Sequence, residues 1–461
     1  MFKKSATFVV KLIYQTMKKT FTLVLLMACV SLHATRYVGG DISMLPQFEQ
    51  NSSGYKDVNG KKISDLITWA VNNCGWNTFR VRIFVNPQQQ APDYSSVDYA
   101  ICQDLAYVTA LGKRIKDAGA NFMLDFHYSD SWVDAVHIQA PKAWKGLSDA
   151  DMADSLGNYT RRVLDALNAA GATPDLVQVG NEIMYGLCGI KVAPYDKSGT
   201  NWDGYLGLLR AGCNAVREKC PQAQIIIHSD RPCNSGYNSY YYQKLIDGDV
   251  DYDIIGLSYY PFWHADFTPT SANTGAQVLQ PLVNAINALK TTFPDKRVHL
   301  VETATNFQNW PTTGVNYDTR PVWPATKAGQ YDFVRDLVDA MLPLDNLDGI
   351  NYWFPEDLGN GDYVNWTTKE GVVEENWSNR GFWSENASTS GHSINRTGQV
   401  TDGKTAQDVC APYLLGKFVG FVPTQDISTI QNQTQATKYL RDGQLIIERN
   451  GVLYAPDGKR R

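Results

Sequence analysis

The chain lacks any concentration of basic residues. Its 461 residues include 42 Lys and Arg against 47 Asp and Glu, which gives a formal net charge of −5 and a pI near 5.8. Proteins that bind nucleic acid usually carry a basic patch or stripe, and the sequence contains none. The composition therefore argues against a nucleic-acid partner.

Cysteine is also scarce, and none of the eight residues forms the C-x-x-C spacing of a zinc site. Seven of them follow the N-terminal region, so at least one thiol has no intramolecular partner. We interpret them as small buried side chains, with at most one or two disulfides, and assign them no catalytic chemistry. They are Cys74, Cys102, Cys188, Cys213, Cys220, Cys233 and Cys410.

The apolar run near the N-terminus, Phe21 to Leu32, is too short to span a membrane comfortably. Lys18 and Lys19 precede it and Ala34 follows it, which is the layout of a secretory signal peptide. We therefore expect residues 1–34 to be a signal and the protein to be secreted, periplasmic or held at the cell surface. An alternative is a lipoprotein, because Leu26-Met-Ala-Cys29 resembles the segment that precedes a lipid-anchored cysteine.

What the sequence does contain is a regular alternation of strand-like and helix-like segments. Eight segments have the apolar, β-branched composition of buried strands, and helical patterns lie between them. The strands are predicted at 37–45, 77–85, 121–129, 175–183, 224–230, 252–260, 297–305 and 347–356, and the helices at 63–73, 99–118, 149–170, 205–219, 276–292 and 325–342.

This order predicts an α/β fold, a (β/α)8 TIM barrel. The barrel would cover residues 36–420, which exceeds the usual ~250 residues and so requires long βα loops. The longest loop follows Glu356 and is rich in Gly, Asn, Ser and Trp, which favours a functional role. Residues 421–461 are interpreted as a short β-rich tail with a hairpin turn at Asn450-Gly451.

Two of the predicted strands end in a glutamate. Asp175-Leu-Val-Gln-Val-Gly-Asn181-Glu182 and Arg297-Val-His-Leu-Val-Glu302-Thr303 are apolar until their last residues. The carboxyl ends of barrel strands converge on one face, so Glu182 and Glu302 should meet there. Two carboxyl groups ~5–5.5 Å apart can hydrolyse a glycosidic bond with retention of configuration. Glu182 is predicted to be the acid/base and Glu302 the nucleophile.

Polar side chains at other strand ends suggest a site for sugar. Arg80 and Arg82 alternate on the second strand, and we expect Arg82 to lie nearer the glutamates, with Arg80 in an ion pair within the barrel. Asp125 and His127 share a face of the third strand, with Trp132 just beyond, and the alternative for His127 is a core histidine. Clustered polar and aromatic groups suit carbohydrate better than a metal. Tyr260 and Trp353 follow the sixth and eighth strands.

Five motifs in order resemble those of glycoside hydrolase family 53. They are Gly39-Gly-Asp41-Ile-Ser43, Phe79-Arg-Val-Arg-Ile-Phe-Val-Asn86-Pro87, Leu124-Asp-Phe-His-Tyr-Ser-Asp130-Ser-Trp132, Gln178-Val-Gly-Asn-Glu182 and Val301-Glu-Thr303. The Asn-Glu pair alone also occurs in a wider clan of barrel hydrolases, but the five motifs together span the barrel.

The resemblance implies an endo-β-1,4-galactanase that cuts the galactan side chains of pectin and needs no cofactor. It also implies that Asn181 binds the sugar 2-hydroxyl, and that Arg82, His127, Tyr260 and Trp353 line the central subsite. Some bacterial members bind calcium in the loop after the seventh strand. Here that loop, 306–318, lacks an acidic cluster, so we do not predict calcium there, although Asp357 and Asp362 leave a weaker possibility.

Two other functions remain open at this point. The same mechanism could act on mannan, glucan or xylan, and a non-catalytic protein could hold glycan at the cell surface through its Trp-rich loops. The presence of both glutamates argues against the second. We expect a monomer whose partner is a polysaccharide.

Overall fold

The computed structural model describes residues 36–87, 101–193, 200–265, 269–308, 321–358, 366–367, 373–374, 379–386, 389–400, 403–423, 437–441, 444–449 and 452–454. The predicted signal, with Cys29, lies outside the described residues.

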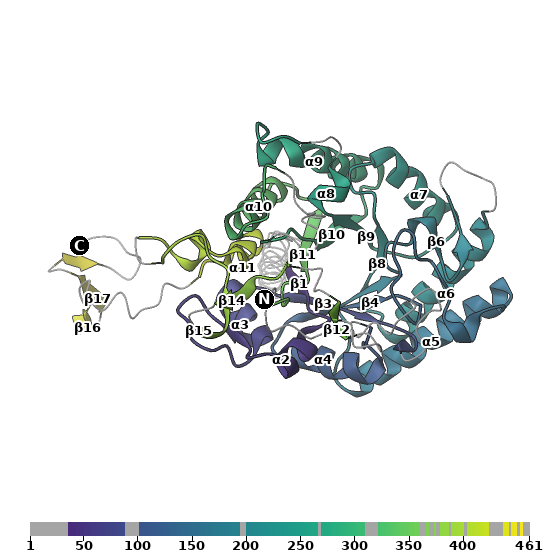
Figure 1. The fold of residues 1–461 in the computed structure, drawn as a ribbon, viewed down its shortest axis with the longest axis horizontal. Helices are drawn as coiled ribbons and strands as arrows, with labels where there is room; N and C mark the ends of the chain where they lie inside the picture. The colour runs from purple at the N-terminus through teal and green to yellow at the C-terminus, as the bar shows by residue number, and fades with distance from the viewer. Residues whose placement is uncertain are drawn as a thin grey trace, which may run out of the picture. The chain divides into compact units, whose positions relative to one another are not determined.

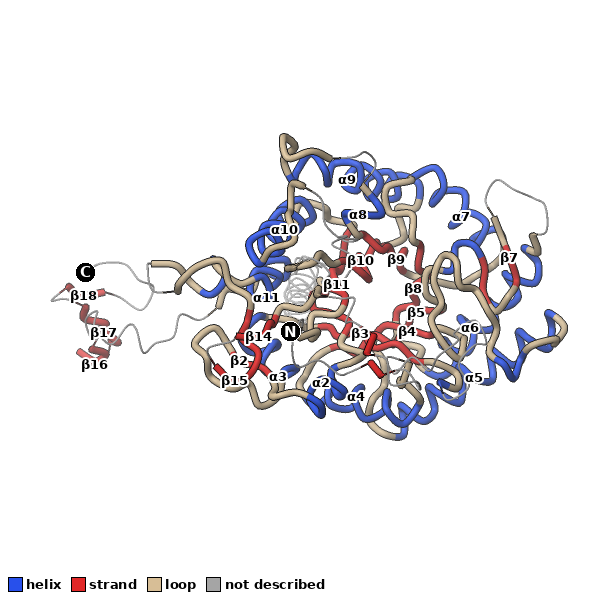
Figure 2. Tube along the Cα trace, viewed as in Figure 1, coloured by secondary structure: helices blue, strands red, loops and turns tan. Residues whose placement is uncertain are grey.

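Eight parallel strands close into a barrel in the order β1-β11-β10-β9-β8-β5-β4-β3, which confirms the predicted (β/α)8 fold. Helices surround the strands in Figures 1 and 2. The strands are β1 (Tyr37–Asp41), β3 (Thr78–Ile83), β4 (Asn121–Phe126), β5 (Leu176–Val179), β8 (Gln224–Ser229), β9 (Ile254–Tyr259), β10 (Arg297–Thr303) and β11 (Leu347–Trp353).

The α-helices begin where side chains can cap them. Ser148 accepts a hydrogen bond from Asp151 N at the start of α5, and Thr274 and Gln277 form a capping box on α9. The helices are α2 (Leu45–Asn51), α3 (Leu66–Cys74), α4 (Leu105–Asp117), α5 (Asp149–Ala169), α6 (Trp202–Lys219), α7 (Ser235–Asp247), α8 (Pro261–His264), α9 (Gly275–Thr292), α10 (Lys327–Met341) and α11 (Ala411–Leu415).

The predicted strands and helices match observed elements to within six residues at each end, but the α-helices α2, α7, α8 and α11 were not predicted. Helix α7 was not among the predicted helices, because its sequence is rich in Tyr, Ser and Asn and has a weak apolar stripe. Asn234 caps it, accepting a hydrogen bond from Tyr237 N. This helix completes the βα unit between β8 and β9.

Small sheets lie outside the barrel. The long segment after Glu356 contributes β14 (Trp383–Asn386) and β15 (Thr389–Ile394), which form a sheet with β2 (Tyr55–Lys56). Trp383 is 1% exposed and packs edge-on against Tyr55 and Trp69. Trp383 is therefore part of the core. For this one residue, the expectation that the Trp-rich loop has a functional role is corrected. The other short strands are β6 (Gly186–Leu187), β7 (Ile190–Lys191), β12 (Trp366–Thr367) and β13 (Val373–Glu374).

The C-terminal region contains the antiparallel strands β16 (Thr437–Arg441), β17 (Gln444–Arg449) and β18 (Val452–Tyr454). Arg449 pairs with Val452, so the two strands flank Asn450-Gly451 as a two-residue hairpin requires. The antiparallel pairing agrees with the predicted hairpin, while the turn residues Asn450-Gly451 themselves lie outside the described residues.

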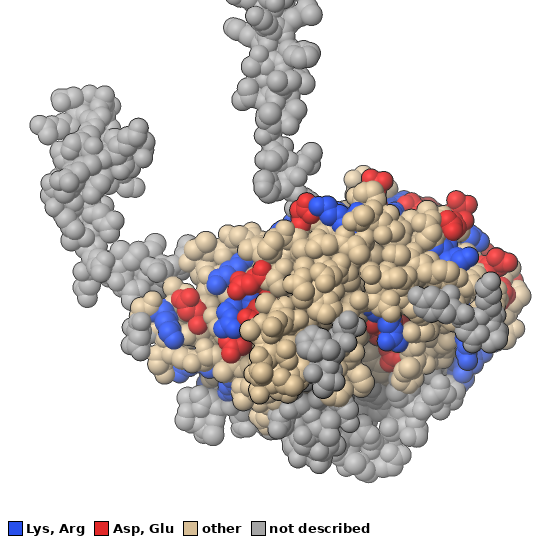
Figure 3. Space-filling view, turned by 90° about the horizontal axis from the view of Figure 1, so that it is seen from above, with Lys and Arg blue, Asp and Glu red and all other residues tan. Residues whose placement is uncertain are grey.

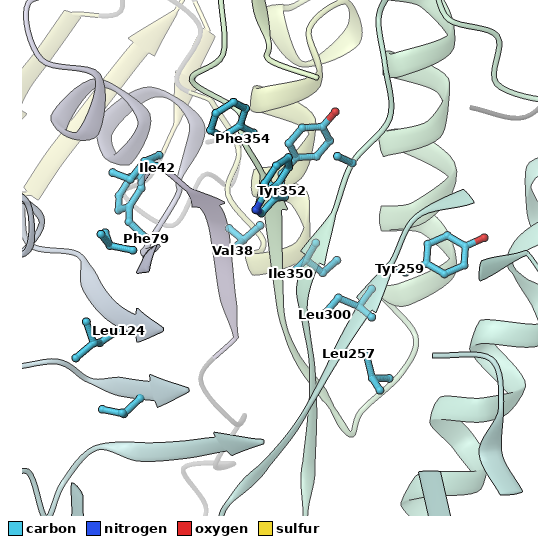
Figure 4. Close-up of a cluster of buried hydrophobic side chains, with 14 of the residues drawn as sticks. Val38, Ile42, Phe79, Leu124, Leu257, Tyr259, Leu300, Ile350, Tyr352 and Phe354 are labelled. Carbon is cyan, nitrogen blue, oxygen red and sulfur yellow. The ribbon is translucent and has the colours of Figure 1, made fainter. Parts of the chain in front are cut away.

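The apolar core has two parts. The larger one joins the outer faces of the strands to the helices, and Figure 4 shows part of it, with Val38, Leu257, Leu300 and Ile350 projecting from neighbouring strands. A small cluster of Met123, Leu176, Ile226, Ile254 and Val301 is separate from it. Side chains two residues apart on a strand share a face, so this cluster lies below the polar side chains that follow it on the same strands.

The seven cysteines from Cys74 onward are free thiols. Within the described residues, none of the helices has both the length and the apolar character needed to cross a membrane. On the face shown in Figure 3, acidic and basic side chains lie close together and broad uncharged areas separate the groups.

Candidate active site

The inner faces of the strands change from apolar to polar toward their carboxyl ends. Met123 is followed two residues later by Asp125, Leu176 by Gln178, and Ile226 by His228. Asp125, Gln178 and His228 are each fully buried and bonded to one another through the Gln178 amide. The strand alternation thus places a hydrogen-bonded polar layer directly above an apolar floor.

Arg80 is the centre of this polar layer. Its guanidinium contacts three carboxylates: Nη1 lies 2.6 Å from Asp41 Oδ2, and Nη2 lies 2.8 Å from Asp125 Oδ2 and 2.9 Å from Glu302 Oε1. Nη2 also donates to Asn181 Oδ1 at 2.8 Å. The side chain is 1% exposed. A buried guanidinium needs such partners, because taking an unpaired charge out of water is costly.

Each carboxyl oxygen of Glu302 has a hydrogen-bonding partner. Oε1 accepts from Arg80, and Oε2 accepts from the Tyr260 hydroxyl at 2.9 Å. Burial raises the pKa of this carboxyl, while the Arg80 charge and the Tyr260 hydrogen bond act in the opposite direction. Both of its oxygens therefore have partners that favour the ionised form.

Glu182 has a different environment. It follows β5 with φ of 48°, a left-handed conformation that is uncommon for residues other than glycine and often found at functional sites. Its Oε1 accepts from Ser258 Oγ at 2.5 Å. Burial raises the pKa of the carboxyl well above its usual value, and the charges of Glu302 and Asp230 raise it further.

A neutral histidine orients the groups around Glu182. His228 Nδ1 accepts from the Glu182 backbone N–H and the Gln178 amide, each at 3.2 Å. Nε2 therefore carries the proton and donates to Ser258 Oγ at 2.8 Å. Burial and the nearby Arg80 charge hold the pKa of His228 well below its usual value. The chain from His228 through Ser258 thus directs a hydroxyl proton to Glu182.

The two carboxyl groups are thereby differentiated. Glu302 faces a cation and a hydroxyl donor, whereas Glu182 lies beside the negative charge of Glu302 and holds its proton to higher pH. A pair of titratable groups whose environments separate their pKa values is the arrangement expected of one acid and one nucleophile. The strands bring the two predicted glutamates together as the barrel geometry required.

The relative placement of the two arginines was predicted wrongly. Arg80, not Arg82, contacts Glu302. Arg82 is 1% exposed, lies 3.7 Å from Asp41 Oδ1 and places its guanidinium over the Trp132 ring at 4.3 Å. A long side chain extends along the strand direction, so the position of the Cα atom does not decide which guanidinium reaches the site.

Asp125 and His127 lie behind the site. Asp125 is fully buried, and its oxygens accept from Gln178 at 2.6 Å and from Arg80 at 2.8 Å. His127 Nδ1 accepts from Val133 N at 3.0 Å, and its Nε2 lies 3.2 Å from Asp125 Oδ2. Both side chains thus have protein partners, and Asp125 also holds Arg80, while their contacts with sugar stay predictions. For His127 this matches the alternative of a core histidine.

The remaining predicted residues lie around the mouth. Asn181 Oδ1 accepts from Arg80, and Nδ2 donates to Val133 O at 2.7 Å, which uses one of its two hydrogens. Trp132 is half-buried beside Arg82. Tyr260 contacts Glu302. Trp353 is 8% exposed and stacks on Phe354. Their contacts with sugar stay predictions.

Sequence reasoning missed Asp41, Gln178, His228 and Ser258 as site residues. Each is a polar residue on the inward face near the carboxyl end of a predicted strand. That shared pattern is the signal that could have identified them. Among the described residues, no cluster of three His, Cys, Asp or Glu side chains could hold a metal ion. Most of the loop 306–318 and Asp362 lie outside the described part, so the prediction about calcium stays open.

The fold and site define a class: barrel glycoside hydrolases with two carboxyl groups in unlike environments. The chain belongs to glycosyl hydrolase family 53, whose model matches residues 37–395. The resemblance inferred from the five motifs is confirmed.

Relatives with known names agree with this assignment. An arabinogalactan endo-beta-1,4-galactanase of Cellvibrio japonicus is 31% identical over 338 residues, covering 69% of this chain and 80% of that protein. An endo-beta-1,4-galactanase of Bacillus subtilis is 30% identical over 325 residues, covering 69% of each. The solved GH53 catalytic domain of Ignisphaera aggregans has a TM-score of 0.66 at 26% identity, covering 85% of this chain and 97% of that one.

Proposed function

We propose that the protein is a retaining endo-hydrolase of β-1,4-galactan, with Glu182 as acid/base and Glu302 as nucleophile. The observation that carries this proposal is the unequal environment of the two carboxyls. Glu302 has an ion pair with Arg80 and a hydrogen bond from Tyr260, while Glu182 has a strongly raised pKa beside it. Membership of family 53 and the names of the Cellvibrio and Bacillus relatives support galactan as the substrate.

The mechanism is a double displacement. Glu302 attacks the anomeric carbon while Glu182 gives its proton to the departing glycosidic oxygen, so that the glycosyl–oxygen bond breaks as the ester forms. Glu182, now ionised, then removes a proton from water, which attacks the same carbon and releases Glu302 as a carboxylate. The first step thus moves the negative charge from Glu302 to Glu182, and the second step restores both residues to their starting states.

Substitution of the two glutamates tests the roles separately. Glu302→Gln should abolish hydrolysis of galactan and of nitrophenyl galacto-oligosides alike. Glu182→Gln should abolish galactan hydrolysis, yet still release a burst of nitrophenol, because that leaving group needs no proton. Glu218→Gln is a matched control, since Glu218 is half-exposed on the surface and pairs with Arg161. Full galactan activity in either active-site variant would refute the proposal.

A panel of linear polysaccharides tests the substrate. Galactan should yield oligosaccharides of mixed length early in the reaction, as an endo-acting enzyme requires, while mannan, glucan and xylan should remain intact. Preferred cleavage of one of the other polymers would keep the mechanism and change the substrate. Tight binding of galactan without shortened products would instead favour a glycan-binding protein.

We further propose that residues 1–34 direct export, that the enzyme acts on pectin galactan as a monomer, and that it requires no metal. Lys18, Lys19 and the apolar run to Leu32 support export, and Cys29 offers lipid anchoring as the alternative. Metabolic labelling with a fatty acid, compared between the natural chain and Cys29→Ala, would separate free export from lipid anchoring.

Activity that survives a chelator would support the absence of a metal requirement.

A further inference from the structure

Asp230 is an acidic residue in the barrel mouth to which the double-displacement mechanism gives no part. It follows β8 directly and lies two residues after His228, whose side chain faces the barrel interior. Because residues two apart share a face, Asp230 points the same way, one step nearer the mouth. Its side chain is 7% exposed. A carboxyl so deeply buried needs polar partners.

The partners of Asp230 account for only one of its oxygens. Oδ2 lies 3.3 Å from Arg231 Nε. Oδ1 is buried and has no hydrogen-bond partner within the described part of the chain. Native proteins rarely leave a buried acceptor unpaired, and such an atom calls for an explanation such as a ligand. Oδ1 of Asp230 can therefore accept a hydrogen bond from a bound ligand.

Strand order places Asp230 on the Glu182 side of the site, because β8, which precedes Asp230, pairs with β5, which precedes Glu182, while β9 separates it from β10, which carries Glu302. The charges of Asp230 and Asp134 also raise the pKa of Glu182. The general acid lies at the glycosidic oxygen, and the nucleophile lies below the anomeric carbon. A side chain that lies beside the acid and away from the nucleophile therefore faces the sugar on the leaving-group side of the cleaved bond.

The neighbours of Asp230 suit a sugar. Arg231 Nε donates to the Tyr185 hydroxyl at 3.0 Å, and the guanidinium lies 5.3 Å from the centre of the Tyr185 ring. The Arg231 side chain is 42% exposed, and Tyr185 is half-buried. A carboxylate accepts from hydroxyls, a guanidinium donates to them, and an aromatic ring packs on the C–H face of a sugar.

We propose that Asp230, together with Arg231 and Tyr185, binds the sugar on the leaving-group side, with Asp230 Oδ1 accepting a hydrogen bond from one of its hydroxyls. The inference rests on the proposed role of Glu182 as the acid. It assigns a specificity role to residues outside the pair that performs the chemistry.

Competition between water and a sugar acceptor tests this binding site. A nitrophenyl galactobioside forms the glycosyl-enzyme, which water hydrolyses and which methyl β-galactoside, seated on the leaving-group side, converts into a transfer product. Asp230→Asn and Asp230→Ala should raise the acceptor concentration needed for half-maximal transfer by about 10- to 100-fold, the value expected for one charge-assisted hydrogen bond. Hydrolysis without acceptor should change far less.

The ratio of transfer to hydrolysis separates binding from an electrostatic effect. Loss of the Asp230 charge also lowers the pKa of Glu182, but Glu182 is the base for both water and acceptor, so this effect cancels in the ratio. Asp134→Asn is the matched control, because it also removes a charge that acts on Glu182, while its oxygens already accept from Val136 N and His137. The control should leave the ratio unchanged.

Several outcomes would overturn the inference: an unchanged ratio in both Asp230 variants, an equal change in Asp134→Asn, or no transfer by the natural protein. If an Asp230 variant fails to fold, Arg231→Gln provides the same test at a more exposed side chain. Release of nitrophenol by Glu302→Gln at the natural rate would instead refute the proposed mechanism, so the two failures are distinguishable.

Discussion

The hydrogen bond from Tyr260 to Glu302 predicts a specific change in the pH dependence of activity. Tyr260→Phe removes a hydroxyl that lies 2.9 Å from Glu302 Oε2 and leaves the ring in place. A hydrogen bond to a charged group contributes roughly 1.5–3 kcal/mol, and about 1.4 kcal/mol corresponds to one pKa unit. Because Glu302 is 7% exposed, water can replace little of the energy of the lost hydrogen bond. The pKa of Glu302 should therefore rise when this hydrogen bond is lost.

The sign of the effect on activity follows from the role of Glu302. A nucleophile must be ionised, so activity falls when the pH drops through its pKa, and a raised pKa moves this acidic limb to higher pH. Glu182 must be protonated and sets the alkaline limb, which should move much less. The assay is kcat/KM against pH for a nitrophenyl galactobioside. The two limbs belong to an interacting pair, so the measured quantity is the displacement of the acidic limb relative to the natural protein.

Tyr159→Phe provides a control of the same chemical type. Its hydroxyl donates to Phe84 O at 2.9 Å and does not touch either glutamate. This change should lower thermal stability and leave the pH profile in place. The reasoning would be refuted if Tyr260→Phe reduced activity by the same factor at every pH, because Tyr260 would then serve only to hold substrate.

Two further substitutions test the site and the core. Arg80→Gln leaves Asp41, Asp125 and Glu302 without their shared cation. Because breaking a buried ion pair costs about 3–5 kcal/mol, denaturant unfolding should show a lower free energy of unfolding, and kcat should be lost as well. A stable, active variant would contradict the ion-pair assignment. Trp383→Ala should lower the free energy of unfolding by about 3–5 kcal/mol, because it leaves a cavity in the core, while kcat of the folded protein stays unchanged. A lower kcat without a loss of stability would instead indicate a role in the site.

The fold could be predicted from the sequence because buried parallel strands have an uninterrupted apolar, β-branched composition. Glu182 and Glu302 stood out for the same reason, since each ends such a run. The omission of α7 has a physical basis as well. Its helix depends on the Asn234 cap and on packing of buried tyrosines such as Tyr241 and Tyr242, rather than on an apolar stripe that a sequence pattern would reveal.

Contacts between strands could not be predicted in the same way. The sequence places Arg80 and Arg82 on one face, but which of them reaches Glu302 depends on how each long side chain extends within a packed barrel. Likewise, His228 has no distinguishing neighbour in the sequence, and its importance arises because Gln178, Ser258 and Glu182 come from other strands to meet it. Such contacts depend on register between strands, which the strand patterns leave undetermined.

The electrostatic link between the two glutamates explains how one carboxyl can serve as acid and then as base. While Glu302 is ionised, its charge raises the pKa of Glu182 and keeps the proton available for the departing oxygen. In the proposed mechanism Glu302 then becomes an ester and loses its charge, so this contribution disappears and the pKa of Glu182 falls. The lowered pKa favours the ionised form that must accept a proton from water. Replacement of Glu302 by Gln mimics the ester in charge, so the pKa of Glu182 in that variant, measured by its carboxyl infrared band against pH, should lie below that of the natural protein. An unchanged pKa would show that the charge of Glu302 does not hold the proton on Glu182.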